Sequence, residues 1–155
     1  MKDRQLKIKQ RKLPHSTIKD AVYFVTFTFS EGALSNPEKE IVFEHILSGK
    51  DIYYDLLTFV VMPDHVHAVF NLIGNYELKD VMKGMKGVSS HLINKTRGKT
   101  GINWIHESFD RIIRNKEELD NVIIYIHQNP FEAGLVEDGN DYSYYYFNEN
   151  WRSEK

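Results

Sequence analysis

Residues 60–70 read VVMPDHVHAVF, and a Pro-Asp pair separates two apolar runs in this stretch. Proline and aspartate are typical of tight turns. We therefore expect two antiparallel strands, Ile52–Met62 and His65–Leu72, joined by a turn at Pro63-Asp64. This hairpin is the centre from which the remaining elements can be placed.

Two histidines flank one valine in the second of these strands. Because successive side chains of a strand alternate between its faces, His65 and His67 share one face while Val66 faces the core. Two imidazoles on one face provide half of a metal site. The spacing leaves open whether the pair binds a metal ion or consists of hydrogen-bonded structural histidines.

The flanking sequence predicts two more strands and three helices. Apolar and β-branched residues mark the outer strands, while the helices begin at capping residues and end at glycine or ahead of proline. The expected strands are Ala21–Phe29 and Trp104–Arg114, and the expected helices run from a capping Asn36 to Gly49, from Asn75 to Asn94, and from Asn115 to Gln128 or Asn129. The last helix must stop there because Pro130 disfavours helix at the preceding residue.

The order strand–helix–strand–strand–helix–strand is that of the ferredoxin-like fold. We therefore expect an α+β protein with a βαββαβ core, in which an antiparallel sheet has its helices on one face. This fold carries many functions, so it does not by itself say what the protein does.

Length and composition set further bounds. The 155 residues suit a single domain over 1–155, with a basic arm at 1–19 and an aromatic tail at 137–155 that packs on the body. The absence of cysteine excludes disulfides, thiolate metal sites and cysteine nucleophiles, and it fits a cytoplasmic protein. The apolar runs are too short to span a bilayer, so no membrane partner is expected. The net charge of −2 argues against a histone-like nucleic-acid binder, but clustered lysines and arginines still permit a basic surface.

The third helix offers polar groups that match the histidine pair. Tyr125 and Asn129 are four residues apart and therefore share a helix face, with Gln128 as the second choice for an amide ligand. A divalent ion held by the two histidines and Asn129 would keep positions open for a substrate oxygen. A phenol has a pKa of about 10 and is a weak nucleophile unless a nearby cation assists it. Tyr125 also has a plainer interpretation, as an aromatic residue of the core or its rim.

Taken together, these motifs resemble those of the single-tyrosine HUH transposases, which are IS200-like, and specifically the REP-associated tyrosine transposase branch. The resemblance covers roughly residues 20–137 and lies in four segments, Val61–His67, Trp104 with Phe109–Arg114, Tyr125-Ile126 with Asn129-Pro130, and Ala133–Val136. Two departures stand out. The tail around Tyr142–Tyr146 lacks the Trp-Ser-Ser of many relatives, and residues 68–70 read Ala-Val-Phe where Leu-Leu-Val is commoner.

The resemblance implies a chemistry for each matched residue. His65, His67 and Asn129 would be the metal ligands, and Tyr125 would attack a phosphodiester of single-stranded DNA. The products would be a 5′-phosphotyrosine link and a free 3′-hydroxyl, held for a later joining step. The family's metal is Mg²⁺ or Mn²⁺, and imidazole ligands favour Mn²⁺ over the harder Mg²⁺.

The family recognises DNA hairpins that flank the cleavage point. Candidate phosphate contacts are Lys83, Lys86, Arg111 and Arg114, each of which has the alternative of a solvated surface charge. Two other functions stay open, a hairpin-binding protein that does not cleave and a metal-dependent hydrolase that uses activated water. Relatives work as monomers or homodimers, and the closer match to the REP-associated branch favours a monomer.

Overall fold

The computed structural model describes residues 20–101, 103–137 and 140–151, so the expected basic arm at 1–19 lies outside the described residues. One antiparallel sheet of five strands has the order β4-β1-β3-β2-β5. The elements, in chain order, are β1 (Tyr23–Thr28), α2 (Asn36–Ser48), β2 (Tyr54–Val61), β3 (His65–Leu72), α3 (Leu78–Arg97), β4 (Phe109–Ile112), α4 (Lys116–Glu132) and β5 (Tyr145–Phe147). The expected α+β class and βαββαβ core are confirmed, and β5 is an addition at the sheet edge.

Strands β2 and β3 form the predicted hairpin, which occupies the middle of the sheet. Its turn closes where the Met62 N–H donates to the His65 carbonyl at 2.8 Å. Strand β1 lies on the other side of β3, where Thr26 is paired with His67. The two histidines therefore lie on the central strand of the sheet, which is paired on both sides.

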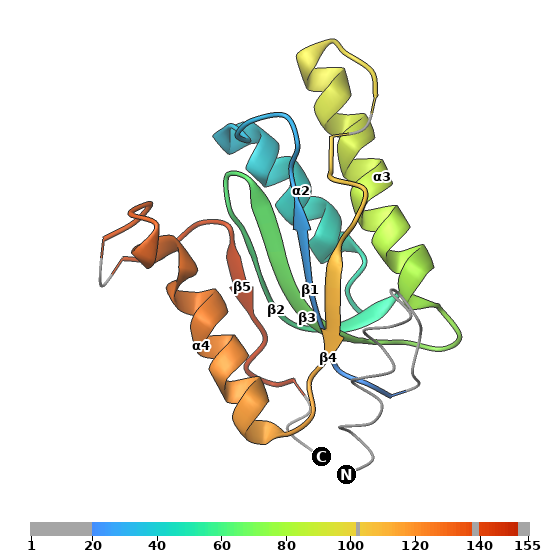
Figure 1. The fold of residues 1–155 in the computed structure, drawn as a ribbon, viewed down its shortest axis with the longest axis vertical. Coiled ribbons are helices and arrows are strands. Elements are labelled where there is room, and N and C mark those ends of the chain that lie inside the picture. The colour runs from blue at the N-terminus through green and yellow to red at the C-terminus, as the bar shows by residue number, and fades with distance from the viewer. Residues whose placement is uncertain (1–19, 102, 138–139, 152–155) are drawn as a thin grey trace.

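The two faces of the sheet are covered by different helices (Figure 1). Alternate residues of the central strands, such as Val25, Phe59 and Val66, belong to one buried cluster together with residues of α2 and α3. The intervening residues, such as Val60 and Val69, form a second cluster with α4. The expectation of helices on one face is therefore right for α2 and α3 and wrong for α4, because both faces of the central strands are apolar and need covering.

Three expected boundaries are wrong, in addition to the end of α4. The cap of α2 is Ser35 rather than Asn36, since the Ser35 hydroxyl accepts from the Glu38 N–H at 3.3 Å. Helix α3 is shifted to Leu78–Arg97, where Gly98 ends it with a φ of +66°. Strand β4 is only four residues long, and Trp104 makes an isolated bridge to Phe29 instead.

Helix α4 continues through Pro130 to Glu132, which contradicts the expected stop before the proline. Proline removes a single N–H donor, and its fixed φ is compatible with a helix. The last turn is closed beyond it, because the Ala133 N–H donates to the Asn129 carbonyl at 3.1 Å and the Leu135 N–H to that of Pro130 at 2.9 Å. Packing of Pro130, which is buried, offsets the lost hydrogen bond.

The aromatic tail packs on the body, as expected. Tyr144 and Tyr146 contact the cluster beneath α2 and α3, and Tyr142, Tyr145 and Trp151 contact the one beneath α4. The Tyr142 hydroxyl donates to the Val61 carbonyl at 2.7 Å. Within the described ranges, no helix has the length and apolar character that a membrane span requires.

Candidate active site

His67 lies beneath α4, with one ring nitrogen hydrogen-bonded and the other without a hydrogen-bond partner among the described residues. Its Nδ1 is 2.7 Å from the Thr26 hydroxyl oxygen, on the adjacent strand. Its Nε2 is buried and has no hydrogen-bond partner in the described part of the chain. Burial, with a smaller contribution from the charge of His65, lowers the pKa of His67 to about 3. When Nδ1–H donates to the hydroxyl, the neutral ring presents a lone pair at Nε2, as a metal ligand does.

His65 is oriented at both nitrogens. The Nδ1 atom lies 2.7 Å from a carboxylate oxygen of Asp64, and Nε2 lies 3.2 Å from the side-chain oxygen of Asn129. The His65 and His67 rings are 4.6 Å apart between centroids. The predicted shared face is therefore confirmed, and an amide oxygen from α4 meets it.

Helix α4 carries Tyr125 to the same place. Val122 and Ile126 are buried against the sheet and fix the rotation of the helix. The Tyr125 ring lies 5.3 Å from the His67 ring at an interplanar angle of 64°, and 49% of the residue is exposed. The phenol is thus next to the histidines and still open to a large substrate.

The donor set fits a divalent cation. Two imidazoles and one amide oxygen converge, and the buried, unpartnered Nε2 of His67 is otherwise unexplained. Among the described residues, no group of three His, Cys, Asp or Glu side chains could hold a metal ion, so a third protein ligand beside the two histidines would have to be of another type. The Asn129 amide oxygen is placed to serve as that ligand, since it lies 3.2 Å from His65 Nε2. No such contact joins the second choice, Gln128, which is exposed, to either histidine among the described residues.

The two candidate arginines bind a carboxylate of α4. Arg111 lies 3.1 Å and Arg114 lies 2.9 Å from carboxylate oxygens of Glu118, which is in the first turn of that helix. The Arg114 backbone N–H also donates to Glu118, at 2.9 Å. Both arginines therefore hold the start of the tyrosine helix, and a contact with DNA stays a prediction.

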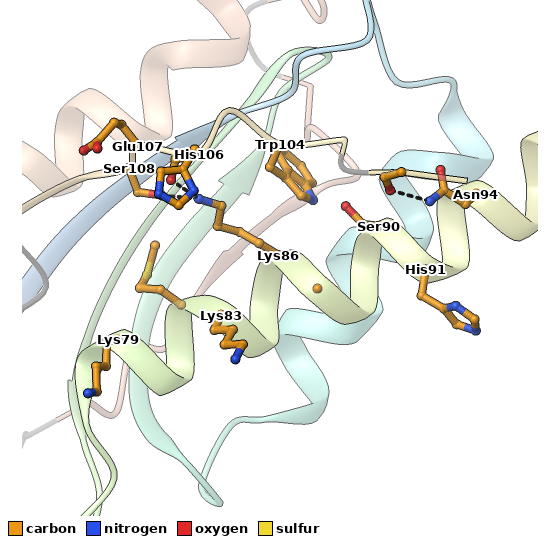
Figure 2. Close-up of a pocket in the computed structure, with 13 residues that line it drawn as sticks. Lys79, Lys83, Lys86, Ser90, His91, Asn94, Trp104, His106, Glu107 and Ser108 are labelled. Carbon is orange, nitrogen blue, oxygen red and sulfur yellow. Dashed lines mark hydrogen bonds between the residues drawn. The ribbon is translucent and has the colours of Figure 1, made fainter. Parts of the chain in front are cut away.

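The two candidate lysines lie on α3, which covers the face of the sheet opposite α4. They line a cavity of about 720 Å³ between α3 and the segment 104–108, with Gly101 also in its wall (Figure 2). Lys86 is tied down, since its Nζ donates to the His106 carbonyl at 2.9 Å and to the Ser108 hydroxyl at 2.8 Å, and burial lowers its pKa. Lys83 is exposed at the cavity. The structure does not bring this pair to Tyr125.

Thr26 and Glu118 are the site residues that the sequence analysis missed. The alternation of apolar and polar residues predicts which face of the sheet Thr26 lies on. It does not predict which side chain Thr26 contacts. Glu118 belongs to a run of acidic residues at a helix start, where capping already explains a carboxylate. Thr26 and its partner His67 are 41 residues apart on neighbouring strands. The arginine partners of Glu118 are near it in the sequence but lie outside the helix, so the periodicity of α4 does not indicate them.

Comparisons with known proteins agree with this geometry. The model of the family described as "Transposase IS200 like" matches residues 32–129, which is more than half of the chain. A Haemophilus influenzae protein named "Putative REP-associated tyrosine transposase" is 24% identical, over 88% of this chain and 85% of its own. The solved structure of a REP-associated tyrosine transposase bound to a REP hairpin superposes with a TM-score of 0.70 at 20% identity, over 83% of this chain and 77% of that one. The protein belongs to the IS200-like transposase family.

Proposed function

We propose that this transposase cleaves and rejoins single-stranded DNA near hairpins, with Tyr125 as the nucleophile and a divalent metal ion at His65, His67 and Asn129. The observation that carries the proposal is the contact between the Tyr125 and His67 rings, whose centroids are 5.3 Å apart, next to the His65–Asn129 pair. Two elements that are distant in the sequence, β3 and α4, place these groups together.

The proposed step is a transesterification. The Tyr125 oxygen forms a bond to phosphorus and the bond from phosphorus to the 3′-oxygen breaks. The phenol proton leaves to solvent, and the departing 3′-oxygen takes up a proton from solvent. The 5′-phosphate stays on the tyrosine and the other strand end keeps a 3′-hydroxyl, so the bond energy is conserved for rejoining. The exposure of Tyr125 supports this role, because a DNA backbone can reach the hydroxyl.

The protein's own residues prepare the metal position. Thr26 and Asp64 orient the two imidazoles from behind, and α4 holds the amide oxygen opposite them. A divalent ion bound there would supply Lewis-acid stabilisation to the phosphodiester oxygens. Two nitrogen ligands favour Mn²⁺ over Mg²⁺.

Two further features concern the DNA and the assembly. The structural relative was solved with a REP hairpin, which supports hairpin DNA as the partner here. Arg111, Arg114, Lys83 and Lys86 remain our candidate phosphate contacts. Tyr125 meets the histidines of its own chain, which supports a site completed within a monomer.

The test is to incubate the protein with hairpin oligonucleotides that carry single-stranded arms, in Mn²⁺, and to look for a covalent protein–DNA adduct on a denaturing gel. We expect an adduct with the wild type and none with Tyr125→Phe, while both bind the hairpin equally. Tyr53→Phe is a matched control, because Tyr53 is similarly exposed, at 43%, but lies before β2.

Other outcomes identify the competing functions. An adduct formed by Tyr125→Phe would show that the nucleophile is another residue. DNA cleavage by Tyr125→Phe without an adduct, lost in His65→Ala, would indicate a hydrolase that activates water. Tight binding with no cleavage in any divalent metal would indicate a binding protein.

A further inference from the structure

A cleft of about 630 Å³ opens beside Tyr125, between α4 and the β4 side of the sheet. One row of side chains forms its floor, because Thr26 pairs in register with His67 on β3 and with Phe109 on β4. The wall comes from positions of α4 that are three, four and seven residues apart, Glu118, Asn121, Val122 and Tyr125. The cleft therefore leads directly from the proposed scissile phosphate to the edge of the sheet.

Phe109 is the unusual residue of this floor, since 51% of it is exposed. The Phe24 ring contacts it edge-on, at 6.4 Å between centroids and 80° between planes. The Arg111 guanidinium covers Phe24 in turn, at 5.4 Å. The Phe109 ring is thus supported by its neighbours and presents apolar surface to the cleft, which suits a flat aromatic ligand.

Asn121 faces the same space from α4, one helical turn before Tyr125. It is exposed, and its side-chain amide makes no hydrogen bond within the described part of the chain. An amide offers one donor and one acceptor side by side, which matches the paired donor and acceptor on the edge of adenine. A stacking surface and an edge-reading group therefore meet beside the nucleophile.

We propose that this cleft binds one unpaired nucleobase of the DNA, next to the phosphodiester that Tyr125 attacks. Phe109 stacks on the base and Asn121 hydrogen-bonds its edge, with adenine as the best match. The inference rests on the proposed function. When one phosphate of the DNA strand lies at Tyr125, the adjacent nucleotide extends away from it. The cleft offers the aromatic surface of Phe109, on which the base of that nucleotide can stack.

The first test uses hairpin oligonucleotides whose single-stranded arms are randomised, incubated with Mn²⁺, with sequencing of the DNA recovered in the adduct. We expect the wild type to prefer adenine at one position within two nucleotides of the cleaved bond. Phe109→Ala should lower the adduct yield about ten-fold, the usual scale of one stacked base, and remove that preference. Phe109→Trp should keep both, and Asn121→Asp should move the preference from adenine to cytosine.

Phe147→Ala is the matched control, since this exposed aromatic lies on β5 at the opposite edge of the sheet and should leave yield and preference unchanged. Thermal unfolding of each variant verifies that it is folded. If Phe109→Ala retains the wild-type base preference, the cleft does not read a base.

A second measurement does not depend on cleavage. The fluorescent base 2-aminopurine is placed in turn at each position of the arm and titrated with protein in the absence of metal. One position should be quenched by the wild type and by Phe109→Trp but not by Phe109→Ala. Identical signals and affinities for the wild type and Phe109→Ala would overturn the inference, whereas Phe109-dependent quenching without any adduct would count against the proposed strand cleavage alone.

Discussion

The side-chain oxygen of Asn129 lies 3.2 Å from Nε2 of His65, so α4 and β3 meet at these two side chains. When the other ring nitrogen donates its hydrogen to Asp64, neither group supplies a proton to the contact. In the proposed metal site, a cation bound by both groups would remove that conflict. The pair would then link the position of the tyrosine helix to metal binding.

Of the two amides near the end of α4, we therefore expect Asn129 to be the one that binds the metal ion. Asn129→Ala should weaken Mn²⁺ binding at least about ten-fold in a calorimetric titration without DNA, because a direct ligand matters no less than the outer residues that orient ligands. Gln128→Ala is the control, since that neighbouring amide is exposed, and its Mn²⁺ affinity should equal that of the wild type. Equal losses in both variants would contradict this assignment.

Thr26 should act on the metal through His67. Its hydroxyl fixes which nitrogen of the imidazole is free, so Thr26→Val should weaken Mn²⁺ binding by about 10- to 100-fold, although Thr26 does not touch the ion. Thr26→Ser keeps the hydroxyl and should restore most of the affinity. If Thr26→Val binds Mn²⁺ as the wild type does, the Nδ1 contact is only structural.

Much of the site follows from local patterns. The turn at Pro63-Asp64 fixes the hairpin, and strand alternation then puts His65 and His67 on one face without further information. Helical spacing in the same way pairs Tyr125 with Asn129. These periodicities are properties of single elements, which is why they can be read from the sequence.

The arrangement of elements could not be read in the same way. The apolar residues of α4 show that one of its faces is buried, but they do not say which face of the sheet it covers. The stop before Pro130 failed because a backbone preference was outweighed by burial of the ring. Glu118 was missed because its partners lie outside α4, with Arg111 on β4 and Arg114 in the connection from β4 to α4.

Glu118 should position the tyrosine helix. Glu118→Gln weakens two partly buried ion pairs and should lower the free energy of unfolding by about 2 kcal/mol in urea denaturation. The rate of adduct formation should also fall, with Mn²⁺ affinity unchanged, because Asn129, the proposed ligand on α4, lies at the other end of that helix and the two histidines are on β3. Asp120→Asn removes an exposed ion pair with Lys116 in the same helix and should change stability by less than about 0.5 kcal/mol. If the two variants lose similar amounts of unfolding free energy, the ion pairs of Glu118 stabilise the protein no more than an exposed ion pair does.

The ion pair between Glu38 and Arg97 should make stability depend on pH. The Arg97 side chain, which ties α3 to the start of α2, lowers the pKa of Glu38 to about 2. The carboxyl of the unfolded chain has its ordinary pKa of 4.5, so the stabilisation is complete well above that pH and is lost as the pH falls toward 2.

Glu38→Gln should therefore cost on the order of 3 kcal/mol at pH 7, and the difference from the wild type should shrink steadily in urea denaturation between pH 5 and pH 2. Glu132→Gln, an exposed carboxylate at the end of α4, is the control and should show a small difference at every pH. If the difference in unfolding free energy between Glu38→Gln and the wild type stays constant from pH 7 to pH 2, the loss does not come from the charge of Glu38. It would then come from poor packing of the amide. The pH dependence, more than the loss at pH 7, thus identifies the ion pair as the source of the stability.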